Sequence, residues 1–556
     1  MSDLRRVLDA RTEAVARLTA AGAPFEIVEE QVRGYPMPVF RNRYRSLNEI
    51  LAESARYGDA EYLVCDDLRL TFTEHLARVA SLAHSLRSEH GVGPGDRVAI
   101  LSANNAEWIM TFWATTALGA ITVGMNSLWS AREVAYGVEL SEPKVIVADA
   151  PRRNLLGPVA VPVLSTEEDV PARASAHPGI ELPHSSVNED DPAVILFTSG
   201  TTGRPKGATH SHRNMVAAVD FHRFNDALAA ELVRAPSRRR FLLATPLFHI
   251  AALHNLAVPR LAFGDTAVIS TGRFDIDRVL ALIEREGLTN WGAVPTMMTR
   301  LVEHGDLSRY DLSSLQTISI SSAPSSSKLK ERLREILPAA ERTLGTSYGL
   351  TESSSAATVA AAADLAERPD TVGRPVLTMQ VEVRDDAGNP VPEGVEGEIC
   401  VRGPLVMLGY WNNPEATASI TDDSGWMRTG DLGTMEDGYL RISSRRSDLI
   451  LRGGENVYPA EVEDALGEHP SVRECIVVGV DHHDYGEEVC AVVVVAAGAS
   501  VTQSELTDYM TERIARYKVP TRWVVQTEEL PRNATGKVKR VDVLTSLTPG
   551  RAGSIH

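Results

Sequence analysis

The sequence predicts an α/β protein, in which a large N-terminal domain of stacked α/β subdomains and a β-rich subdomain precedes a small α+β C-terminal domain. The chain has 556 residues, about three to four times a typical single domain, so more than one domain is expected. Apolar runs of strand length recur, as at 98–101 and 194–197, and amphipathic segments of helix length separate most of them. Such alternation is typical of a mainly parallel sheet covered by helices.

Changes in sequence texture predict the domain limits. Residues 1–45 form an N-terminal extension, in which apolar residues follow one helical face until the pattern breaks. The large domain covers 46–447, and a part rich in glycine, aspartate and short strands, at about 371–444, is its β-rich subdomain. The small domain covers 448–556, after a polar stretch at Arg445–Asp448.

Composition and charge exclude several classes of protein. Hydrophobic residues make up 43% and charged residues 23% of the chain, which argues against disorder and low-complexity structure. The formal net charge of −18 opposes binding to nucleic acid or anionic lipid, and no apolar run is long enough to span a membrane. The N-terminus lacks the apolar block of a signal peptide, and four scattered cysteines fit neither a disulfide framework nor a zinc site. We therefore expect a cytoplasmic protein with small-molecule partners.

The strongest local motif is VILFTSGTTGRPKG at residues 194–207. An apolar strand leads into a loop of glycines, hydroxyl side chains and one lysine, Lys206. Glycines let successive backbone N–H groups turn inward, so the loop suits a polyphosphate. The offsets of a Walker P-loop are missing, and the alternative is a flexible surface loop.

Seven further segments follow this loop in an order that resembles the adenylate-forming superfamily. That superfamily includes acyl-CoA synthetases, luciferases and carrier-protein adenylation domains, and the resemblance covers roughly residues 46–545. The segments are PLFH (246–249), YGLTE (348–352), VGRP (372–375), GEICVRG (397–403), GWMRTGD (425–431), GGENVYP (453–459) and PRNATGK (531–537).

The resemblance implies two half-reactions with ATP, Mg²⁺ and coenzyme A (CoA) as cofactors. A carboxylate and ATP form an acyl-adenylate and pyrophosphate, and the thiol of CoA then displaces AMP. The main barrier is bringing two anions together, so the implied catalytic residues include Lys537, which bridges them, Thr351 at the α-phosphate, and Glu352 as a Mg²⁺ ligand. Thr198 is a second implied metal ligand, and His249 an implied gate between the ATP site and the acyl pocket.

The remaining implied residues fall into four groups. The phosphate group adds Ser199, Gly200, Thr201, Thr202 and Gly203, and the nucleoside group comprises Ser322, Ala323, Pro324, Tyr348, Gly349, Asp431 and Arg445. The CoA group comprises Gly453, Gly454 and Asn456, and Asp448 is the hinge on which the mobile small domain rotates. The acyl pocket is lined by Ala251, Ala252, Ala293, Met297, Ser321 and Leu350.

Small and adaptable apolar residues in the implied pocket predict an apolar substrate. A medium- or long-chain fatty acid or a similar apolar acid is the main expectation, and an aryl or alicyclic acid is an alternative. The sequence is also compatible with a fatty acyl-AMP ligase, with an enzyme that adenylates for a carrier protein, and with a nucleotide-binding scaffold without turnover. A homodimer is compatible with the sequence as well.

Two further clusters have simple interpretations. His210 and His212 lack the accompanying ligands of a metal site and are expected to be solvated loop residues. A basic run at 238–240, with Arg234 before it, could meet the phosphates of CoA, although such runs are usually solvated.

Overall fold

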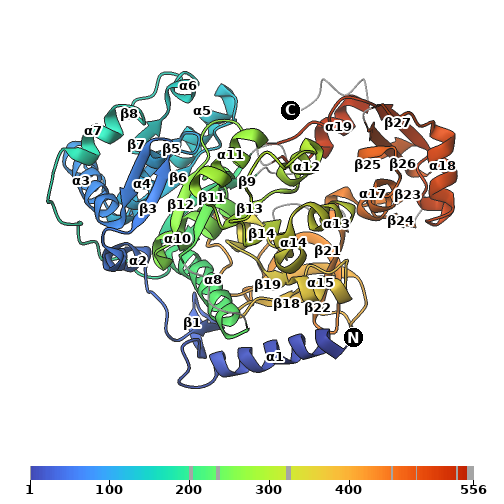
Figure 1. Cartoon of the computed structure of the whole chain (residues 1–556), viewed down its shortest axis with the longest axis horizontal. Coiled ribbons are helices and arrows are strands. Elements are labelled where there is room, and N and C mark those ends of the chain that lie inside the picture. Colours follow the sequence, from blue (N-terminus) through green and yellow to red (C-terminus); the bar gives the residue numbers. More distant parts are fainter. Residues whose placement is uncertain are drawn as a thin grey trace.

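The α/β class is confirmed by the computed structural model, and Figure 1 shows the large domain with the small domain beside it at the upper right. Helices surround two extended sheets in the large domain, and a smaller sheet forms the β-rich part (Figure 1). The structure describes residues 2–198, 205–232, 238–320, 327–452, 455–483, 485–496, 498–533 and 536–547.

The first sheet of the large domain has seven described strands in the order β20-β10-β9-β6-β5-β7-β8. The strands from β9 to β7 pair in parallel and are buried on both faces, which explains their unbroken apolar sequences, whereas β10 pairs antiparallel with β9 and β20. The helices α3 (Phe72–His90) and α4 (Ala106–Ala117) pack against each other beside it. The strands are β5 (Arg97–Leu101), β6 (Ile121–Gly124), β7 (Val145–Ala148), β8 (Val163–Ser165), β9 (Pro192–Thr198), β10 (Lys206–Ser211) and β20 (Gly409–Tyr410).

The second sheet has nine described strands in the order β17-β16-β15-β14-β13-β11-β12-β3-β4. The helices α11 (Ile276–Glu286), α12 (Pro295–His304) and α13 (Ser327–Ile336) accompany it. The strands are β3 (Glu61–Cys65), β4 (Leu68–Thr71), β11 (Arg240–Leu243), β12 (Thr266–Ile269), β13 (Asn290–Ala293), β14 (Thr317–Ile320), β15 (Gly345–Tyr348), β16 (Thr358–Ala360) and β17 (Arg374–Pro375).

The C-terminal third holds two more sheets. The first is antiparallel, in the order β18-β19-β21-β22, and the second, in the small domain, runs β24-β23-β26-β25 with β27 on β26. Among the described helices none is long and apolar enough to cross a bilayer. The elements are β18 (Gln380–Arg384), β19 (Gly397–Arg402), β21 (Met427–Glu436), β22 (Tyr439–Arg445), β23 (Ile450–Arg452), β24 (Glu455–Val457), α17 (Pro459–Gly467), β25 (Val472–His482), β26 (Gly486–Val495), α18 (Gln503–Thr511), β27 (Arg522–Gln526) and α19 (Arg540–Leu547).

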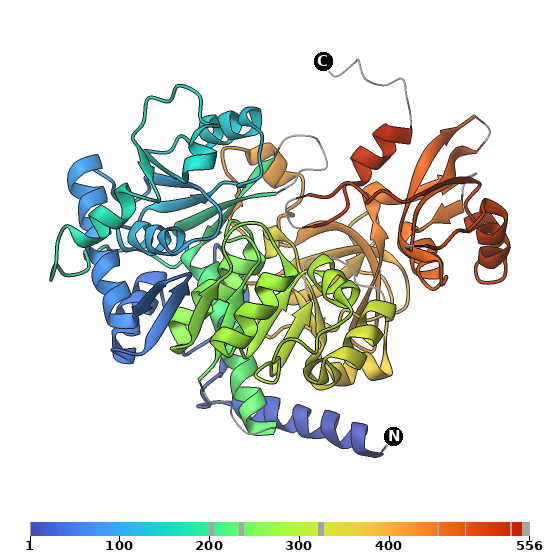
Figure 2. The same ribbon diagram turned by 45° about the horizontal axis from the view of Figure 1, so that its top comes forward.

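The N-terminal extension is docked on the large domain. Figure 2 shows α1 (Ser2–Thr19) extending along the outside of the large domain, and α1 packs against α8 (His212–Leu232). Buried Leu18 belongs to the same apolar cluster as Phe224 and Leu228 of α8. After α1, a hairpin of β1 (Ile27–Val32) and β2 (Tyr35–Phe40) carries Arg33 at its turn, and the Arg33 guanidinium donates to the backbone oxygen of Met407 at 2.8 Å.

Candidate active site

Three predicted nucleoside residues meet at the junction of two sheets. Asp431 of β21 lies opposite Arg445 of β22 in the antiparallel register, and the Arg445 Nε is 3.4 Å from the Asp431 Oδ1. Tyr348, the last residue of β15, donates its hydroxyl to the Asp431 Oδ2 at 2.7 Å. Burial raises the pKa of the Asp431 carboxyl, and the charge of Arg445 and the hydroxyl of Tyr348 oppose that rise. Asp431 therefore presents a fixed acceptor, the type of group that binds ribose hydroxyls.

Lys537 of the small domain lies within electrostatic range of this group. It follows a tight turn in which the Lys537 backbone N–H donates to the Asn533 Oδ1 at 2.9 Å. Burial lowers the pKa of Lys537, the nearby positive charge of Arg445 lowers it further, and the carboxylates of Asp431 and Asp448 oppose both effects. Lys537 itself remains exposed to solvent. The structure thus brings residues more than a hundred positions apart into one charged group.

The turn before Lys537 rests on α12 of the large domain. A Cβ added at Gly536 would lie 2.3 Å from the Thr296 Oγ1, so only glycine fits this approach. On the same helix, the Glu303 carboxylate pairs with Arg473 of β25 at 2.5 and 2.9 Å. These contacts seat the small domain, with the turn before Lys537, against α12.

The two ends of the predicted phosphate loop are described. Thr198 ends β9 and pairs across the antiparallel ladder with Lys206, the first residue of β10. The Lys206 Nζ lies 4.9 Å from the ring centroid of Tyr410, and the Tyr410 hydroxyl donates to the Glu352 Oε1 at 2.7 Å. Thr351 and Glu352 belong to one 3₁₀ turn after Tyr348. Sequence reasoning missed Tyr410, because it lies outside every matched motif.

The Glu352 carboxylate is suited to binding Mg²⁺. Glu352 forms no ion pair within the described residues, and those residues contain no cluster of three or more His, Cys, Asp or Glu able to hold a metal. Mg²⁺ at phosphate sites is usually held by one or two carboxylates, phosphate oxygens and water, so Glu352 fits the expected ion.

Three other predicted residues form no hydrogen bond or ion pair with Glu352 or Asp431 in the part of the chain that the structure describes: Gly349, Asp448 and Asn456. Gly349 approaches the Ser355 backbone oxygen so closely that a Cβ would lie 2.3 Å from it. Asp448 pairs with Arg540 at 3.2 Å, and Asn456, on β24, is exposed. Eleven predicted residues lie outside the described part of the chain: Ser199, Gly200, Thr201, Thr202, Gly203, Ser321, Ser322, Ala323, Pro324, Gly453 and Gly454.

The predicted pocket residues differ in accessibility. Ala251 and Leu350 are half-buried, while Ala252, Ala293 and Met297 are buried in apolar clusters. His249 directly precedes α9 (Ile250–Ala252), and its Nε2 is shielded without a hydrogen-bond partner within the described residues. Burial lowers the pKa of His249 to about 4, so the imidazole is neutral near pH 7.

The expectation that His210 and His212 are solvated is wrong. Both are fully buried, because His210 lies on the inner strand β10 and His212 opens α8. The His212 Nδ1 accepts from the Leu47 backbone N–H at 3.2 Å, and the His210 Nδ1 lies 2.7 Å from the Ser354 Oγ.

Two arginines of the basic run at 238–240 form ion pairs within the large domain. Arg239 forms ion pairs with Asp226 and Asp265, and Arg240 with Glu61 and Glu286, at 2.6 to 3.0 Å. These pairs engage both guanidinium groups within the large domain, which disfavours a role in binding CoA phosphates. Arg234 lies outside the described residues.

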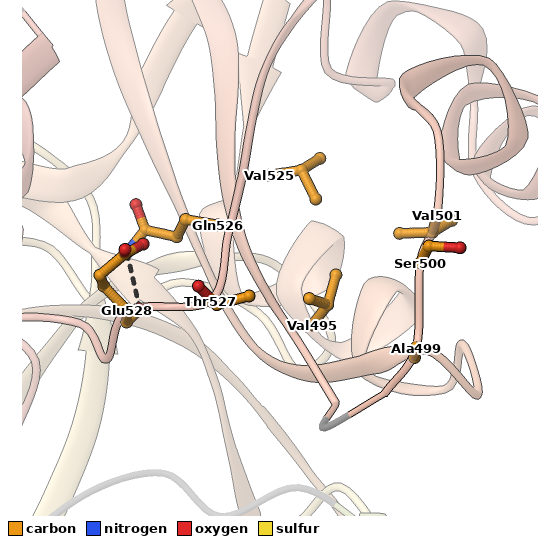
Figure 3. Close-up of a pocket in the computed structure, with 8 residues that line it drawn as sticks. All are labelled: Val495, Ala499, Ser500, Val501, Val525, Gln526, Thr527 and Glu528. Carbon is orange, nitrogen blue, oxygen red and sulfur yellow. Dashed lines mark hydrogen bonds between the residues drawn. The ribbon is translucent and has the colours of Figure 1, made fainter.

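A separate hollow of about 380 Å³ lies on the small domain, and Lys537 is not among its lining residues. Figure 3 shows Val495, Val501 and Val525 on its walls, with Glu528 at one side. The described lining of the hollow has no charged pair or cluster that would define a ligand, and we assign it no role.

Comparison with known proteins identifies the family. The model of the AMP-binding enzyme family matches residues 51–411, and that of the AMP-binding enzyme C-terminal domain matches 461–537. A feruloyl-CoA synthase of an Amycolatopsis species is 37% identical over 475 residues, covering 85% of this chain and 93% of the relative. A long-chain-fatty-acid–CoA ligase of Mycobacterium tuberculosis is 32% identical over 485 residues, covering 85% and 92%.

A solved structure agrees with this assignment. The o-succinylbenzoate-CoA synthetase of Bacillus subtilis, in complex with its acyl-adenylate intermediate, matches with a TM-score of 0.78 and 30% identity. The match covers 92% of this chain and 100% of that chain. The chain therefore belongs to the AMP-binding enzyme family, as an adenylate-forming enzyme of the acyl-CoA synthetase type.

Proposed function

We propose that this enzyme activates a carboxylic acid with an aromatic or alicyclic body and transfers it to CoA. The reaction class is that of an AMP-forming acid–CoA ligase, with ATP, Mg²⁺ and CoA. The observation that carries the proposal is that Lys537 of the small domain lies close enough to Asp431 and Arg445 of the large domain for their charges to act on its pKa. A cation from one domain and a nucleoside-binding carboxylate from the other are what the first half-reaction needs.

In the first half-reaction, a carboxylate oxygen of the acid attacks the α-phosphorus of ATP, and the bond to pyrophosphate breaks. Lys537 holds the two anions together, which removes most of the barrier to their approach. Asp431 accepts the ribose hydroxyls, and Tyr348 orients its carboxylate. Mg²⁺, with Glu352 as its ligand, supplies neutralisation of the phosphate charge when bound.

In the second half-reaction, the CoA sulfur attacks the acyl carbon, the acyl–phosphate bond breaks, and AMP leaves with the electron pair. The thiol proton passes to solvent. We propose that the small domain rotates about Asp448 between the two steps, which withdraws Lys537 and brings Gly453 and Gly454 toward CoA.

Two observations support an aryl or alicyclic acid. The feruloyl-CoA synthase is 37% identical, against 32% for the long-chain-fatty-acid–CoA ligase. Polar side chains also occur beside the segments assigned to the pocket, as at Ser355 and Asn255. A medium- or long-chain fatty acid is the second candidate, favoured by small Ala251 and half-buried Leu350.

The test is pyrophosphate release by purified protein with a panel of acids, with and without CoA. The panel contains benzoate, cinnamate, 4-hydroxycinnamate, octanoate and palmitate, and thioesters are separated by chromatography. We expect CoA-dependent thioester formation, with the highest kcat/KM among the aryl acids. Adenylate accumulation that CoA does not relieve would favour an acyl-AMP ligase or a carrier-protein partner. A preference for octanoate or palmitate would overturn the aryl assignment, and no turnover with any acid would overturn the function.

A further inference from the structure

Three fully buried side chains from distant segments form a polar cluster, and two of the three lie within four residues of positions assigned to the acyl pocket. The Ser354 Oγ lies 2.7 Å from the His210 Nδ1, and the Ser354 backbone oxygen lies 3.1 Å from the His254 Nδ1. The two imidazole rings meet edge to face, with centroids 4.8 Å apart. Burying two histidines and a serine at zero exposure costs free energy that apolar packing does not offset, so their polar atoms need hydrogen-bond partners.

The hydrogen bond to a carbonyl fixes the tautomer of His254. A backbone oxygen only accepts, so the His254 Nδ1 must donate and carries the proton. Burial lowers the pKa of His254 to about 3, so the ring is neutral near pH 7 and its Nε2 holds a lone pair. That Nε2 is buried without a partner in the described part of the chain. A buried acceptor of this kind needs a donor, since leaving it unmet is costly.

A second set of hydrogen-bonded polar side chains lies next to this cluster. Asn255 accepts at its Oδ1 from the Ser355 hydroxyl and lies 3.2 Å from the His222 Nε2, and its amide donates to the Ile250 backbone oxygen at 3.1 Å. Asn255 and His222 are half-buried, and both the oxygen and the nitrogen of the Asn255 amide are engaged. In the first cluster the Nε2 atoms of His210 and His254 both lack a partner within the described residues. Only that of His254 is fixed as an acceptor, because the His210 Nδ1 pairs with a hydroxyl, which can either donate or accept.

Both groups of hydrogen-bonded side chains lie close in sequence to the proposed pocket residues. His254 and Asn255 follow pocket residue Ala251 on the π-helical turn Leu253–Ala257, and Ser354 follows pocket residue Leu350 and the 3₁₀ turn of Glu352. The Ser354 backbone has φ = +56°, a conformation that L-residues adopt only when their surroundings enforce it. A strained backbone that presents a hydrogen-bonding serine is typical of a functional site.

We infer that the His254 Nε2 accepts a hydrogen bond from a hydroxyl group carried by the acid, so that the enzyme selects hydroxylated acids over their unsubstituted counterparts. The inference rests on the proposed function and makes it more specific. It replaces a uniformly apolar pocket with one in which a buried acceptor, the His254 Nε2, stands among apolar walls. An acid without the hydroxyl leaves that acceptor unpaired and is selected against for this reason.

The test compares matched acids on the full chain. Pyrophosphate release is measured for cinnamate against 2-, 3- and 4-hydroxycinnamate, and for 3-phenylpropanoate against its hydroxylated forms. We expect kcat/KM to be at least about tenfold higher for one hydroxylated isomer in each series. His254→Leu should reduce that ratio to near unity, while His254→Gln, which keeps a donor and an acceptor, should retain much of it.

His75→Leu is the matched control. His75 is equally buried, has neither ring nitrogen paired within the described residues, and lies on α3, so the same substitution there tests stability alone. It should leave the selectivity ratio unchanged. Equal turnover of hydroxylated and unsubstituted acids by the wild type would overturn the inference and spare the proposed function. An equal loss with both acids in His254→Leu would show a merely structural histidine and also overturn it. If His254→Leu does not fold, the wild-type ratio and His254→Gln still decide.

Discussion

Replacing Gly536 with alanine should separate the two half-reactions. Gly536 immediately precedes Lys537 and lies against Thr296 of α12, so it is the point at which the catalytic turn touches the large domain. A rotated small domain would no longer make this contact. Crowding at Gly536 therefore disfavours the arrangement for adenylation and leaves the arrangement for thioester formation unaffected.

The structure gives the size of the effect. The Gly536 φ of +77° makes alanine strained by roughly 1–2 kcal/mol in either arrangement, so this part cancels. The added Cβ would lie 2.3 Å from the Thr296 Oγ1 and 3.2 Å from its Cβ, where ordinary contacts begin at 3.4 Å. Overpacking of this kind costs roughly 1–3 kcal/mol, so adenylation should slow by about 5- to 150-fold.

The assay measures each half-reaction separately. Pyrophosphate release reports adenylation, and thioester formation from pre-made acyl-adenylate and CoA reports the second step. Thr296→Ala in the Gly536→Ala background removes the nearest atom and should restore most of the lost adenylation rate, whereas Thr296→Ala alone should change little. If Gly536→Ala slowed both steps equally and Thr296→Ala restored nothing, the contact would have no part in domain closure.

Three other changes test the same structure. Lys537→Ala should lower adenylation by roughly 10²–10³-fold and spare thioester formation from pre-made adenylate, because the cation acts only on the first step. Arg473→Ala removes a partly exposed pair with Glu303, worth about 0.5–1 kcal/mol, so pyrophosphate release should slow two- to fivefold while the second step keeps its rate. Stability should fall as pH drops below about 6.5, because burial lowers the pKa of His75 to about 3 and only the unfolded chain takes up the proton. His75→Leu should flatten that dependence in thermal melts by at most about 1.4 kcal/mol per pH unit, and an unchanged slope would exclude His75 as its source.

The fold class could be predicted because its physical cause is local. Strands such as β5 and β9 are buried on both faces, so each is an uninterrupted apolar run that needs no knowledge of its neighbours. The motif residues could likewise be picked out by type and order. Their spatial arrangement could not be predicted, because it depends on the pairing of Asp431 with Arg445 and on the contact of the small domain with α12.

The histidines show where local reasoning stops. The polar residues in the segment after Lys206 favour a solvated loop, although the segment is an inner strand. His210 can be buried because it has a hydrogen-bond partner, Ser354. That partner lies 144 residues away in the chain, so the local sequence gives no sign of it. Tyr410 could not be predicted for the same reason, since its partner Glu352 is 58 residues distant. Long-range polar pairs leave no periodic signal in the sequence.

The contacts on either side of Ser447 locate the hinge more narrowly than the motif does. Arg446 pairs with Asp386 at 2.9 Å, which ties it to the large domain. Asp448 pairs with Arg540 of α19 at 3.2 Å, so its carboxylate is bound to the small domain that carries Lys537. A rotation that preserves both pairs must take up its change in backbone torsion between these two residues. We therefore propose that the 3₁₀ turn Arg446–Asp448 (η4), with Ser447 at its centre, absorbs the domain rotation, and that Asp448 moves with the small domain.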